Sequence, residues 1–591
     1  MSRTAKLQSR VHSRDSLSSD KMGSNLIPIV IASVAAWLFY QLIVHPLFLS
    51  PLSNIPVPHW SCHISPLWIL YTRKANCQNR TLHQAHLRLG PVVRIAPNEL
   101  SVDGYDVLKV VYQGGFEKDE WYSIFDNYGH RHNDCKYSVT DDRRSVPCMF
   151  STLPSKPHSL RKRMVSNVYS KSFIHTSEAA NAQSRAILFD RLLPLLSASA
   201  SASASGEPPS GAGLDVFSTF LATTMDFITA YIFGLRNATD FIRDRAYRDH
   251  WLQLYLARAS HGFWPQELPR LTALCAKVSR SRWKPYPAWV DGANAEIAAW
   301  NRKLCEAADD FIHGRNKNGS SSAGVAGKQE EEDPANEPVV FRALEAGVEK
   351  ERLANGEASL LYRTTILQKD LSIASEVMDQ VLAGQETAGI ALTYLAWHLS
   401  KSPDLQLCLR HELLTLAPSL AMAPDACLPP RLPDPKQVDA LPLLHAVMME
   451  TLRLHAPIPG PEPRRTPRHP PCRLGGFHVP GGVRVAALGY ALHRNAEVFP
   501  DPETWDHKRW LEDSGIGEER RRDMMRYFWA FGSGGRMCVG SNFAMNEMKL
   551  IAAAIWTNFT THIVDDTDID QDDTYTARPI AERLFLRFEH V

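Results

Sequence analysis

The chain has 591 residues, of which 44% are hydrophobic, 9% aromatic and 22% charged, and these ordinary values exclude wholesale disorder and fibrous repeats. Lysine plus arginine total 65 and aspartate plus glutamate total 64, so the net charge is +1. A net charge this close to zero gives the protein no overall positive potential that would attract a polyanion, so we expect no nucleic-acid partner.

An uncharged apolar segment near the start predicts a membrane anchor. Residues 26–44 read LIPIVIASVAAWLFYQLIV, which is about the length that a helix needs to cross a hydrocarbon core. Apolar side chains surround this helix on all sides, which disfavours a core helix, and no small-residue cleavage site follows, which disfavours a signal peptide. Residues 1–25 form a polar, basic tail, and residues 45–60 contain four prolines that predict a stiff, non-helical connector.

Residues 61–591 are expected to form one mainly helical domain. GPVVRIAPNELSV, residues 90–102, combines β-branched and turn residues and predicts a small hairpin. Apolar residues at helical spacing predict a long helix over about 371–398 that ends before Pro403. Two segments near 197–213 and 316–338 lack the apolar content to pack, so we expect solvent-exposed insertions there.

A glycine-rich loop near the C-terminus carries the strongest chemical signal. FGSGGRMCVGSNFA, residues 531–544, fits the pattern F-x-x-G-x-R-x-C-x-G and places Cys538 just before an amphipathic helix. Backbone N–H groups and the helix dipole favour a thiolate at such a position. The other nine of the 10 cysteines are scattered without a CxxC pair, so they indicate neither a zinc site nor a disulfide framework and are typical of a reducing compartment.

This loop resembles the cysteine signature of the cytochrome P450 family, the haem-thiolate monooxygenases, and the resemblance extends from about Pro56 to the C-terminus. It implies a mainly α fold with small β-sheets (α+β), preceded here by a single N-terminal transmembrane helix. It also implies heme b (iron-protoporphyrin IX) as the cofactor, with Cys538 as the axial ligand of the iron. Thiolate ligation pushes electron density onto iron and favours O–O cleavage.

A second constellation is METLRLH, which places Glu450 and Arg453 at i, i+3 on one helix face, where an acid and a base can pair. Such a pair alone is usually solvated and worth little. The resemblance implies a buried structural triad instead, and DHKRW supplies Arg509 as its third member. The family's usual proline and glutamate before that arginine are His507 and Lys508 here.

A third constellation is AGQETAG, residues 383–389, in the middle of the long helix. Each of its two glycines lowers helix stability by about 1 kcal/mol relative to alanine, so their presence in a helix requires an explanation. The resemblance implies an acid–alcohol pair above the haem, Glu386 and Thr387, that delivers protons, and Gly384 would leave room for dioxygen. From the residues alone, Thr387 could simply bond back to a carbonyl one turn earlier. Relatives that rearrange peroxides without O₂ often lack this threonine, so its presence favours monooxygenation.

The resemblance also implies a set of residues that hold the haem and its two propionates. The matching positions are Arg536, Arg464, His493, His158 and Lys162. Arginine suits this role because its fork can bind a carboxylate bidentately, and the adjacent Arg465 could replace Arg464. The family usually has tryptophan and arginine where this chain has His158 and Lys162, and lysine is the weaker, point-charge substitute.

The implied reaction inserts one oxygen atom from O₂ into a lipophilic small molecule, and GPVVRIAPNELS is similar to fungal members of secondary metabolite biosynthesis. An aromatic lid expected at residues 261–268 fits such a substrate. Electrons would come from NADPH through a separate NADPH-cytochrome P450 reductase, to which basic clusters at 161–163 and 520–526 offer complementary charge. The basic tail would by itself stay in the cytosol. Anchored family members instead keep the catalytic domain on the cytosolic face of the endoplasmic reticulum, and we expect that orientation.

Two other functions remain open. The first is an isomerase or dehydratase of the same fold that does not use O₂, and peroxide leakage from a Thr387→Ala variant would separate it from a monooxygenase. The second is a non-enzymatic membrane protein that binds haem or a lipid, which predicts haem incorporation without NADPH-dependent turnover.

Overall fold

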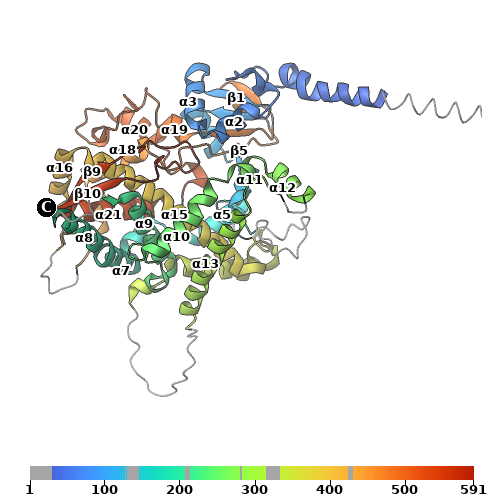
Figure 1. Ribbon diagram of the computed structural model, residues 1–591. Helices are drawn as coiled ribbons and strands as arrows, with labels where there is room; N and C mark the ends of the chain where they lie inside the picture. Colours follow the sequence, from blue (N-terminus) through green and yellow to red (C-terminus); the bar gives the residue numbers. More distant parts are fainter. Residues whose placement is uncertain are drawn as a thin grey trace, which may run out of the picture.

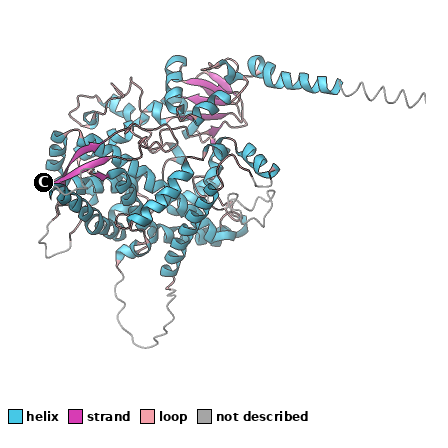
Figure 2. Ribbon diagram, in the orientation of Figure 1, coloured by secondary structure: helices cyan, strands magenta, loops and turns pink. Residues whose placement is uncertain are grey.

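The computed structural model describes residues 29–126, 128, 146–205, 213–279, 283–314, 333–422 and 430–591. A mainly helical body carries small sheets at two of its sides, as Figure 1 and Figure 2 show, and an N-terminal helix extends away from it. The mainly α fold with small sheets, predicted from the sequence, is confirmed.

The N-terminal helix covers Ile29–Leu49 and none of it is buried in the body. Its last part, Tyr40–Leu49, has the wider turns of a π-helix and continues through Pro46, so the predicted connector begins five residues too early. A wide turn accommodates a proline because the missing N–H and the ring displace the bond to the carbonyl four residues back. Residues 1–28, which include the predicted basic tail, lie outside the described residues.

The largest sheet has five strands in the order β1-β2-β8-β5-β3. These strands are β1 (Val92–Ala96), β2 (Glu99–Val102), β8 (Arg484–Ala487), β5 (Arg464–Arg465) and β3 (Glu117–Lys118). The hairpin predicted over 90–102 is confirmed, because β1 and β2 pair antiparallel with Val93 opposite Ser101. The other sheets are β4-β10-β9, formed by Leu214–Asp215, Phe585–His590 and Phe559–Asp565, and β6-β7, formed by Cys472–Leu474 and Phe477–Val479.

The helices of the first half are α2 (Leu67–Lys74), α3 (Gln78–Leu89), α4 (Tyr105–Leu108), α5 (Ser155–Val165), α6 (Lys171–Thr176), α7 (Glu178–Arg185), α8 (Leu193–Ser205), α9 (Val216–Phe233), α10 (Arg245–Ala259), α11 (Phe263–Glu267), α12 (Pro269–Val278) and α13 (Trp289–Ile312). Those of the second half are α14 (Val339–Asn355), α15 (Lys369–Ser400), α16 (Pro403–Leu413), α17 (Pro435–Asp439), α18 (Pro442–Leu454), α19 (Gly489–Leu492), α20 (Glu518–Tyr527) and α21 (Ser541–Asn558).

The centre of the body is the long helix α15, which covers the predicted 371–398 and ends before Pro403. Helix α9 packs along α15. It is apolar enough to cross a membrane, but 94% of its 18 residues are buried in the body. The two helices approach so closely that a Cβ on Gly384 would lie 2.8 Å from Ile228 and one on Gly389 would lie 2.7 Å from Leu221. Close helix packing therefore explains the glycines of AGQETAG. The space beside Gly384, which we expected to be open for dioxygen, is filled by Ile228.

The two expected insertions differ from one another. Residues 197–205, expected to be part of an exposed loop, continue helix α8, whose alternating alanine and serine can be helical where Ala200 packs into the core. Most of the second segment lies outside the described residues. Its end forms a short turn in which the Asp333 side chain accepts a hydrogen bond from the Ala335 N–H.

Candidate active site

The cysteine loop is fixed by backbone contacts between α20 and α21. The Cys538 N–H donates to the Phe531 carbonyl at 2.9 Å, which closes the loop just before α21 begins at Ser541. Gly534 has a φ of +70°, and a Cβ there would lie 2.5 Å from the Tyr112 carbonyl oxygen. Only glycine fits this position, because both the backbone conformation and the close approach exclude a side chain.

We infer that the Cys538 thiol faces a space enclosed by the protein. The side chain is exposed, yet burial raises the pKa of the thiol, while the Gly540 N–H and the charge of Lys162 act to lower it. A side chain can have an uncovered surface and still be strongly desolvated when it faces a space that the protein encloses. We call this the interior space.

One face of α15 forms another wall of the interior space. Ala383 is exposed and Asp379 and Thr387 are half-buried, whereas Gln380, Val381, Gln385 and Glu386 between them are buried. These three residues lie four apart, so they share one helix face. The charge of Asp379 contributes to raising the pKa of Cys538, so the two groups lie close enough to interact electrostatically. The Thr387 hydroxyl donates to the Ala383 carbonyl at 2.8 Å.

Glu386 belongs to a different face of the helix. Its carboxylate is buried and accepts from the Arg578 Nε and from the Tyr255 hydroxyl, each at 2.5 Å. The structure therefore brings the Thr387 hydroxyl to the interior space but not the Glu386 carboxylate. Sequence reasoning missed both partners, because Tyr255 and Arg578 lie far from Glu386 along the chain and have no motif of their own.

Basic side chains gather beside the cysteine loop. They come from β3, α5, β5 and the loop itself, and they are Lys118, His158, Lys162, Arg464 and Arg536, which we call the basic cluster. Burial first, and then the charges of the other members, lower the pKa of His158 to about 2 and that of Arg536 to about 10. The same causes hold the pKa of Lys118 well below its usual value. The cluster thus has more positive charge than its surroundings balance.

Two acids pair within the basic cluster. Glu462 lies 3.1 Å from Arg464, and Glu117 lies 3.1 Å from Arg536. Arg536 also donates to the carbonyls of Thr152 at 2.7 Å and Leu153 at 2.6 Å.

The structure distinguishes the two adjacent arginines of β5. Arg464 is buried and donates to the Tyr122 hydroxyl at 2.7 Å, whereas Arg465 points outward and pairs with Asp119. Successive residues of a strand face opposite sides, so only one of the two can join the basic cluster. Lys162 joins it from α5 and donates to the Met537 carbonyl at 2.9 Å, which attaches α5 to the cysteine loop.

His493 lies beside α19, and its predicted contact with a propionate stays a prediction. Its ring Nε2 accepts from the Trp529 N–H at 2.6 Å, and its backbone carbonyl accepts from Arg453 at 2.8 Å. Burial, then the charges of Arg453 and Arg494, lower the pKa of His493 to about 3, so the ring is neutral. Its position beside α19 ties it to the surroundings of Arg453 rather than to the basic cluster.

Glu450 pairs with both arginines of the expected triad in the buried core. Its Oε1 lies 2.8 Å from Arg453 and 3.0 Å from Arg509, and its Oε2 accepts from the Trp510 indole at 2.9 Å. Arg453 also donates to the Pro502 carbonyl at 2.7 Å. A buried ion pair is tolerated only when its remaining donors and acceptors are satisfied, and this network satisfies them across three chain segments. His507 and Lys508 leave it intact.

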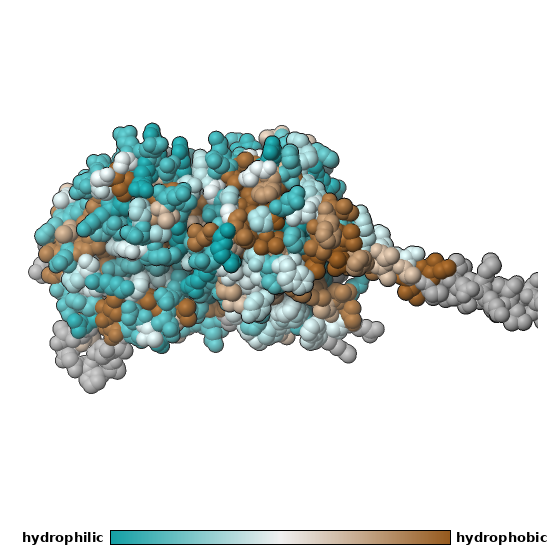
Figure 3. Space-filling view, turned by 90° about the horizontal axis from the view of Figure 1, so that it is seen from above, coloured by the Kyte–Doolittle hydropathy of each residue, from teal (hydrophilic) through white to brown (hydrophobic). Residues whose placement is uncertain are grey.

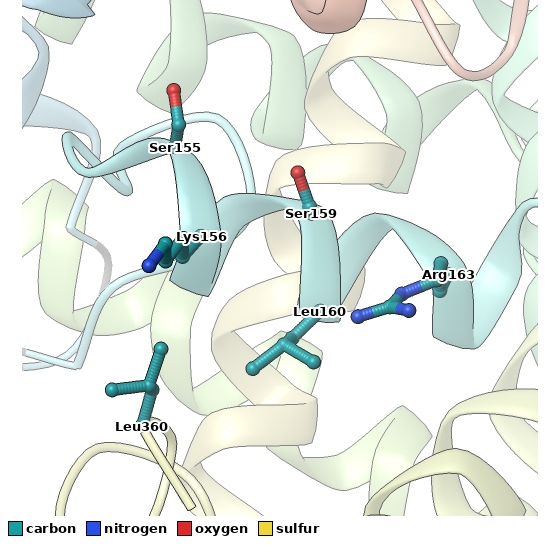
Figure 4. Close-up of a pocket in the computed structure, with 6 residues that line it drawn as sticks. All are labelled: Ser155, Lys156, Ser159, Leu160, Arg163 and Leu360. Carbon is teal, nitrogen blue, oxygen red and sulfur yellow. The ribbon is translucent and has the colours of Figure 1, made fainter.

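An open cavity of about 310 Å³ lies on the outer side of α5, away from His158 and Lys162. Figure 4 shows the residues that line it, which are Ser155, Lys156, Ser159, Leu160, Arg163 and Leu360. It is separate from the interior space and presents basic side chains to solvent.

Comparison of the sequence with known proteins relates it to a family. The family model for cytochrome P450 matches residues 362–582. The chain is 25% identical to the cytochrome P450 monooxygenase avaI of Aspergillus versicolor, over 80% of this chain and 96% of that protein. It is 24% identical to the cytochrome P450 monooxygenase hkm5 of Aspergillus hancockii, over 94% and 95%. The cytochrome P450 monooxygenase stcB of Emericella nidulans is 32% identical over 36% of this chain and 38% of its own length.

Residues 362–582 match the cytochrome P450 family, and relatives that align along most of the chain are named cytochrome P450 monooxygenases. A cytochrome P450 implies a haem, and the interior space has the chemistry to hold one. Cys538 offers a soft sulfur donor. Burial and nearby positive charge lower the pKa of Lys118, His158 and Arg536, so the basic cluster fits a pair of carboxylates. Lys118 and Tyr122 belong to this arrangement and were not found from the sequence, because they carry no signal until β3 and β5 pair.

Proposed function

We propose that this cytochrome P450 is a haem-dependent monooxygenase that inserts one oxygen atom from O₂ into a lipophilic small molecule of fungal secondary metabolism. The observation that carries the proposal is the interior space, with the Cys538 thiol on one side and the Thr387 face of α15 on another. The relatives, all fungal cytochrome P450 monooxygenases, support the same reaction class.

The chain's own residues hold the cofactor. Cys538 would supply the sulfur ligand of the iron, and the Gly540 N–H would stabilise its thiolate form. The basic cluster would bind the propionates, chiefly through the guanidinium groups of Arg464 and Arg536, while Lys162 links α5 to the loop. When bound, a thiolate-ligated haem supplies O₂ activation and O–O cleavage.

Proton delivery is assigned to Thr387, which holds a hydroxyl at the interior space. Its hydrogen bond to the Ala383 carbonyl fixes the oxygen, whose lone pairs can accept a hydrogen bond from water. Rotation of the hydroxyl away from that carbonyl would direct its proton into the interior space, and a proton from the water would replace it. Glu386 supports this step as a positioning residue. Arg578 and Tyr255 hold its carboxylate beside the helix backbone, where it fixes this part of α15.

Electrons are proposed to come from NADPH-cytochrome P450 reductase, which would dock on exposed basic side chains near the cysteine loop. Arg161 does not belong to this surface, because it is buried and donates to Ser372 at 3.3 Å and Thr364 at 3.1 Å. The exposed basic residues are Lys156, Arg163, Arg520, Arg522 and Arg526. The outer side of α5 in Figure 4 supplies the first two.

The protein is proposed to sit in the endoplasmic reticulum membrane by one span, with its catalytic domain in the cytosol. The helix Ile29–Leu49 is long and apolar enough to cross a membrane. Figure 3 shows apolar side chains gathered on this helix and on the adjoining end of the domain, which suits contact with a lipid surface.

The test is to express the full chain with the reductase in microsomes and record the ferrous–CO difference spectrum of the wild type and of Cys538→Ser. A thiolate-type CO band that the serine variant lacks, together with NADPH-dependent turnover, is the expected result. Loss of an oxygenated metabolite in a strain lacking the gene, with accumulation of its precursor, would then identify the substrate. Haem binding by the microsomal protein without NADPH-dependent turnover of any metabolite from that strain would contradict the proposal.

A further inference from the structure

Helices α11 and α12 lie where the sequence predicts an aromatic lid, and we call these two helices the lid. Every residue of Phe263–Glu267 and Pro269–Val278 is half-buried or exposed, so neither helix places a residue in the buried core. Figure 1 shows α12 at the outer edge of the body, beyond α11. Elements with few buried apolar contacts open at low cost. Polar contacts therefore matter more for the attachment of the lid than for that of the core helices.

One buried carboxylate attaches the lid to the body. The side chain of Glu267, at the end of α11, is only 8% exposed. It accepts from Arg73 of α2 at 2.8 Å and from the Trp121 indole N–H at 2.8 Å. Arg484 of β8 lies 3.5 Å from the same carboxylate. Three segments that are distant in the chain thus hold Glu267: a helix, a strand and the short 3-10 helix η4 (Glu120–Phe125).

A second acid allows the body to release this carboxylate. Glu99 of β2 also pairs with Arg73, and it lies 3.2 Å from Arg484. With the lid closed, two carboxylates balance two arginines. With the lid open, both arginines keep Glu99 as a partner, but one of their two charges is no longer balanced. Because an unbalanced buried charge is costly, the network favours the closed lid without making closure permanent.

The contacts of Glu267 lead on to the basic cluster. The ring of Trp121 packs edge-on against Tyr122, with centroids 5.1 Å apart, and against Tyr575 at 5.3 Å. The Tyr122 hydroxyl accepts from Arg464 of the basic cluster at 2.7 Å. The lid therefore rests on residues that contact the proposed cofactor site.

We propose that Glu267 is the latch of this lid and sets how fast a lipophilic ligand enters and leaves the interior space. The inference rests on the proposed function, because the interior space is where the ligand binds. Glu267 acts as a positioning residue, since it holds α11 against α2, β8 and η4. A lid that must open for entry and for exit changes both rates by the same factor and leaves the equilibrium affinity unchanged.

The test follows clotrimazole, a bulky azole that ligates haem iron, as it binds to and dissociates from the full-length holoenzyme in stopped-flow experiments. Glu267→Gln keeps the shape of the side chain and removes its charge. The matched control is Glu120→Gln, which breaks an exposed pair between η4 and Arg270 of α12 at 3.6 Å. Such exposed pairs contribute little. Hydrogen exchange of lid peptides, which does not depend on the haem spectrum, is measured on the same proteins.

We expect Glu267→Gln to raise both clotrimazole rates about tenfold, to keep Kd within about twofold and to speed hydrogen exchange of the lid. Glu120→Gln should change none of these. Unchanged rates in Glu267→Gln, or a changed Kd without faster exchange of the lid, would overturn the inference. A wild type without a thiolate-type ferrous–CO band would contradict the proposed function, whereas a normal band with unchanged clotrimazole rates in Glu267→Gln would contradict the latch alone.

Discussion

At the scale of single residues, the reaction depends on where one hydroxyl lies. Thr387 holds its oxygen at the interior space through a bond to the Ala383 carbonyl, and Glu386 is tied to Arg578 and Tyr255 on another face. Replacing Thr387 by alanine removes the proton donor but not the cofactor site. We expect the variant to consume NADPH and release hydrogen peroxide while product formation falls about tenfold or more, measured by peroxide assay against product yield.

The matched control for this change is Thr387→Ser, which keeps a hydroxyl and should restore most of the coupling between NADPH consumption and product. An enzyme that rearranges its substrate without O₂ would be indifferent to Thr387→Ala. Unchanged product yield without peroxide would therefore argue for that alternative reaction.

The two neighbouring arginines of β5 provide a second residue-scale prediction. Arg464 joins the basic cluster and Arg465 pairs with Asp119 near the surface. Arg464→Met should lower haem content and speed haem loss, because it removes a donor for a propionate. Arg465→Met should leave both unchanged. Haem-to-protein ratio and the rate of haem transfer to apomyoglobin measure the difference, and equal behaviour of the two variants would remove Arg464 from the cofactor site.

At the scale of elements, the close contact between α9 and α15 shapes the centre of the protein. Thr224 of α9 donates to the Gln385 carbonyl at 2.6 Å, and Gly384 leaves room for Ile228. Gly384→Ala gains about 1 kcal/mol of helix propensity but forces a Cβ to 2.8 Å from Ile228. Because overpacking costs about 1–3 kcal/mol, we expect a net loss of about 1 kcal/mol in unfolding free energy.

A second-site change tests that cause. In an Ile228→Ala background the space beside residue 384 is open, so Gly384→Ala should stabilise the protein there by about 1 kcal/mol. Thermal unfolding of the four proteins in this cycle gives the coupling. The same sign of the Gly384→Ala effect in both backgrounds would show that the glycine is retained for another reason.

The elements also separate what the sequence could predict from what it could not. The hairpin of β1 and β2, the long helix α15 and the cysteine loop follow from local patterns, because each is specified by residues that are neighbours in the chain. Long-range packing alone brings three further residues to the site, and such contacts have no fixed spacing in the sequence from which to predict them. These residues are Lys118, Tyr255 and Arg578. The surroundings of His493 were missed for the same reason, since the sequence did not show that its ring accepts from the Trp529 N–H.

At the scale of the whole molecule, charge on the surface around α5 and α20 should control the encounter with the reductase. Arg163 is exposed on the outer side of α5, so Arg163→Glu should raise the KM for reductase about fivefold, equivalent to about 1 kcal/mol. Arg587→Glu, an exposed change on β10, should not. Rising salt should reduce reductase-supported turnover of the wild type more than that of Arg163→Glu, because exposed charges are screened. Equal salt dependence would exclude this docking surface.

The orientation of the anchor decides whether the molecule can work at all. A basic tail before the span favours a cytosolic N-terminus, which would place the catalytic domain in the lumen. Cys538 favours the opposite arrangement, because its sulfur must remain reduced to serve as the proposed thiolate ligand, whereas the lumen is oxidising. The reductase that supplies electrons is also expected on the cytosolic face. We therefore expect protease added to intact microsomes to digest the domain after the helix Ile29–Leu49, with a lumenal marker protein left intact as the control. Protection of the domain until detergent is added would show that the charge of the tail sets the topology.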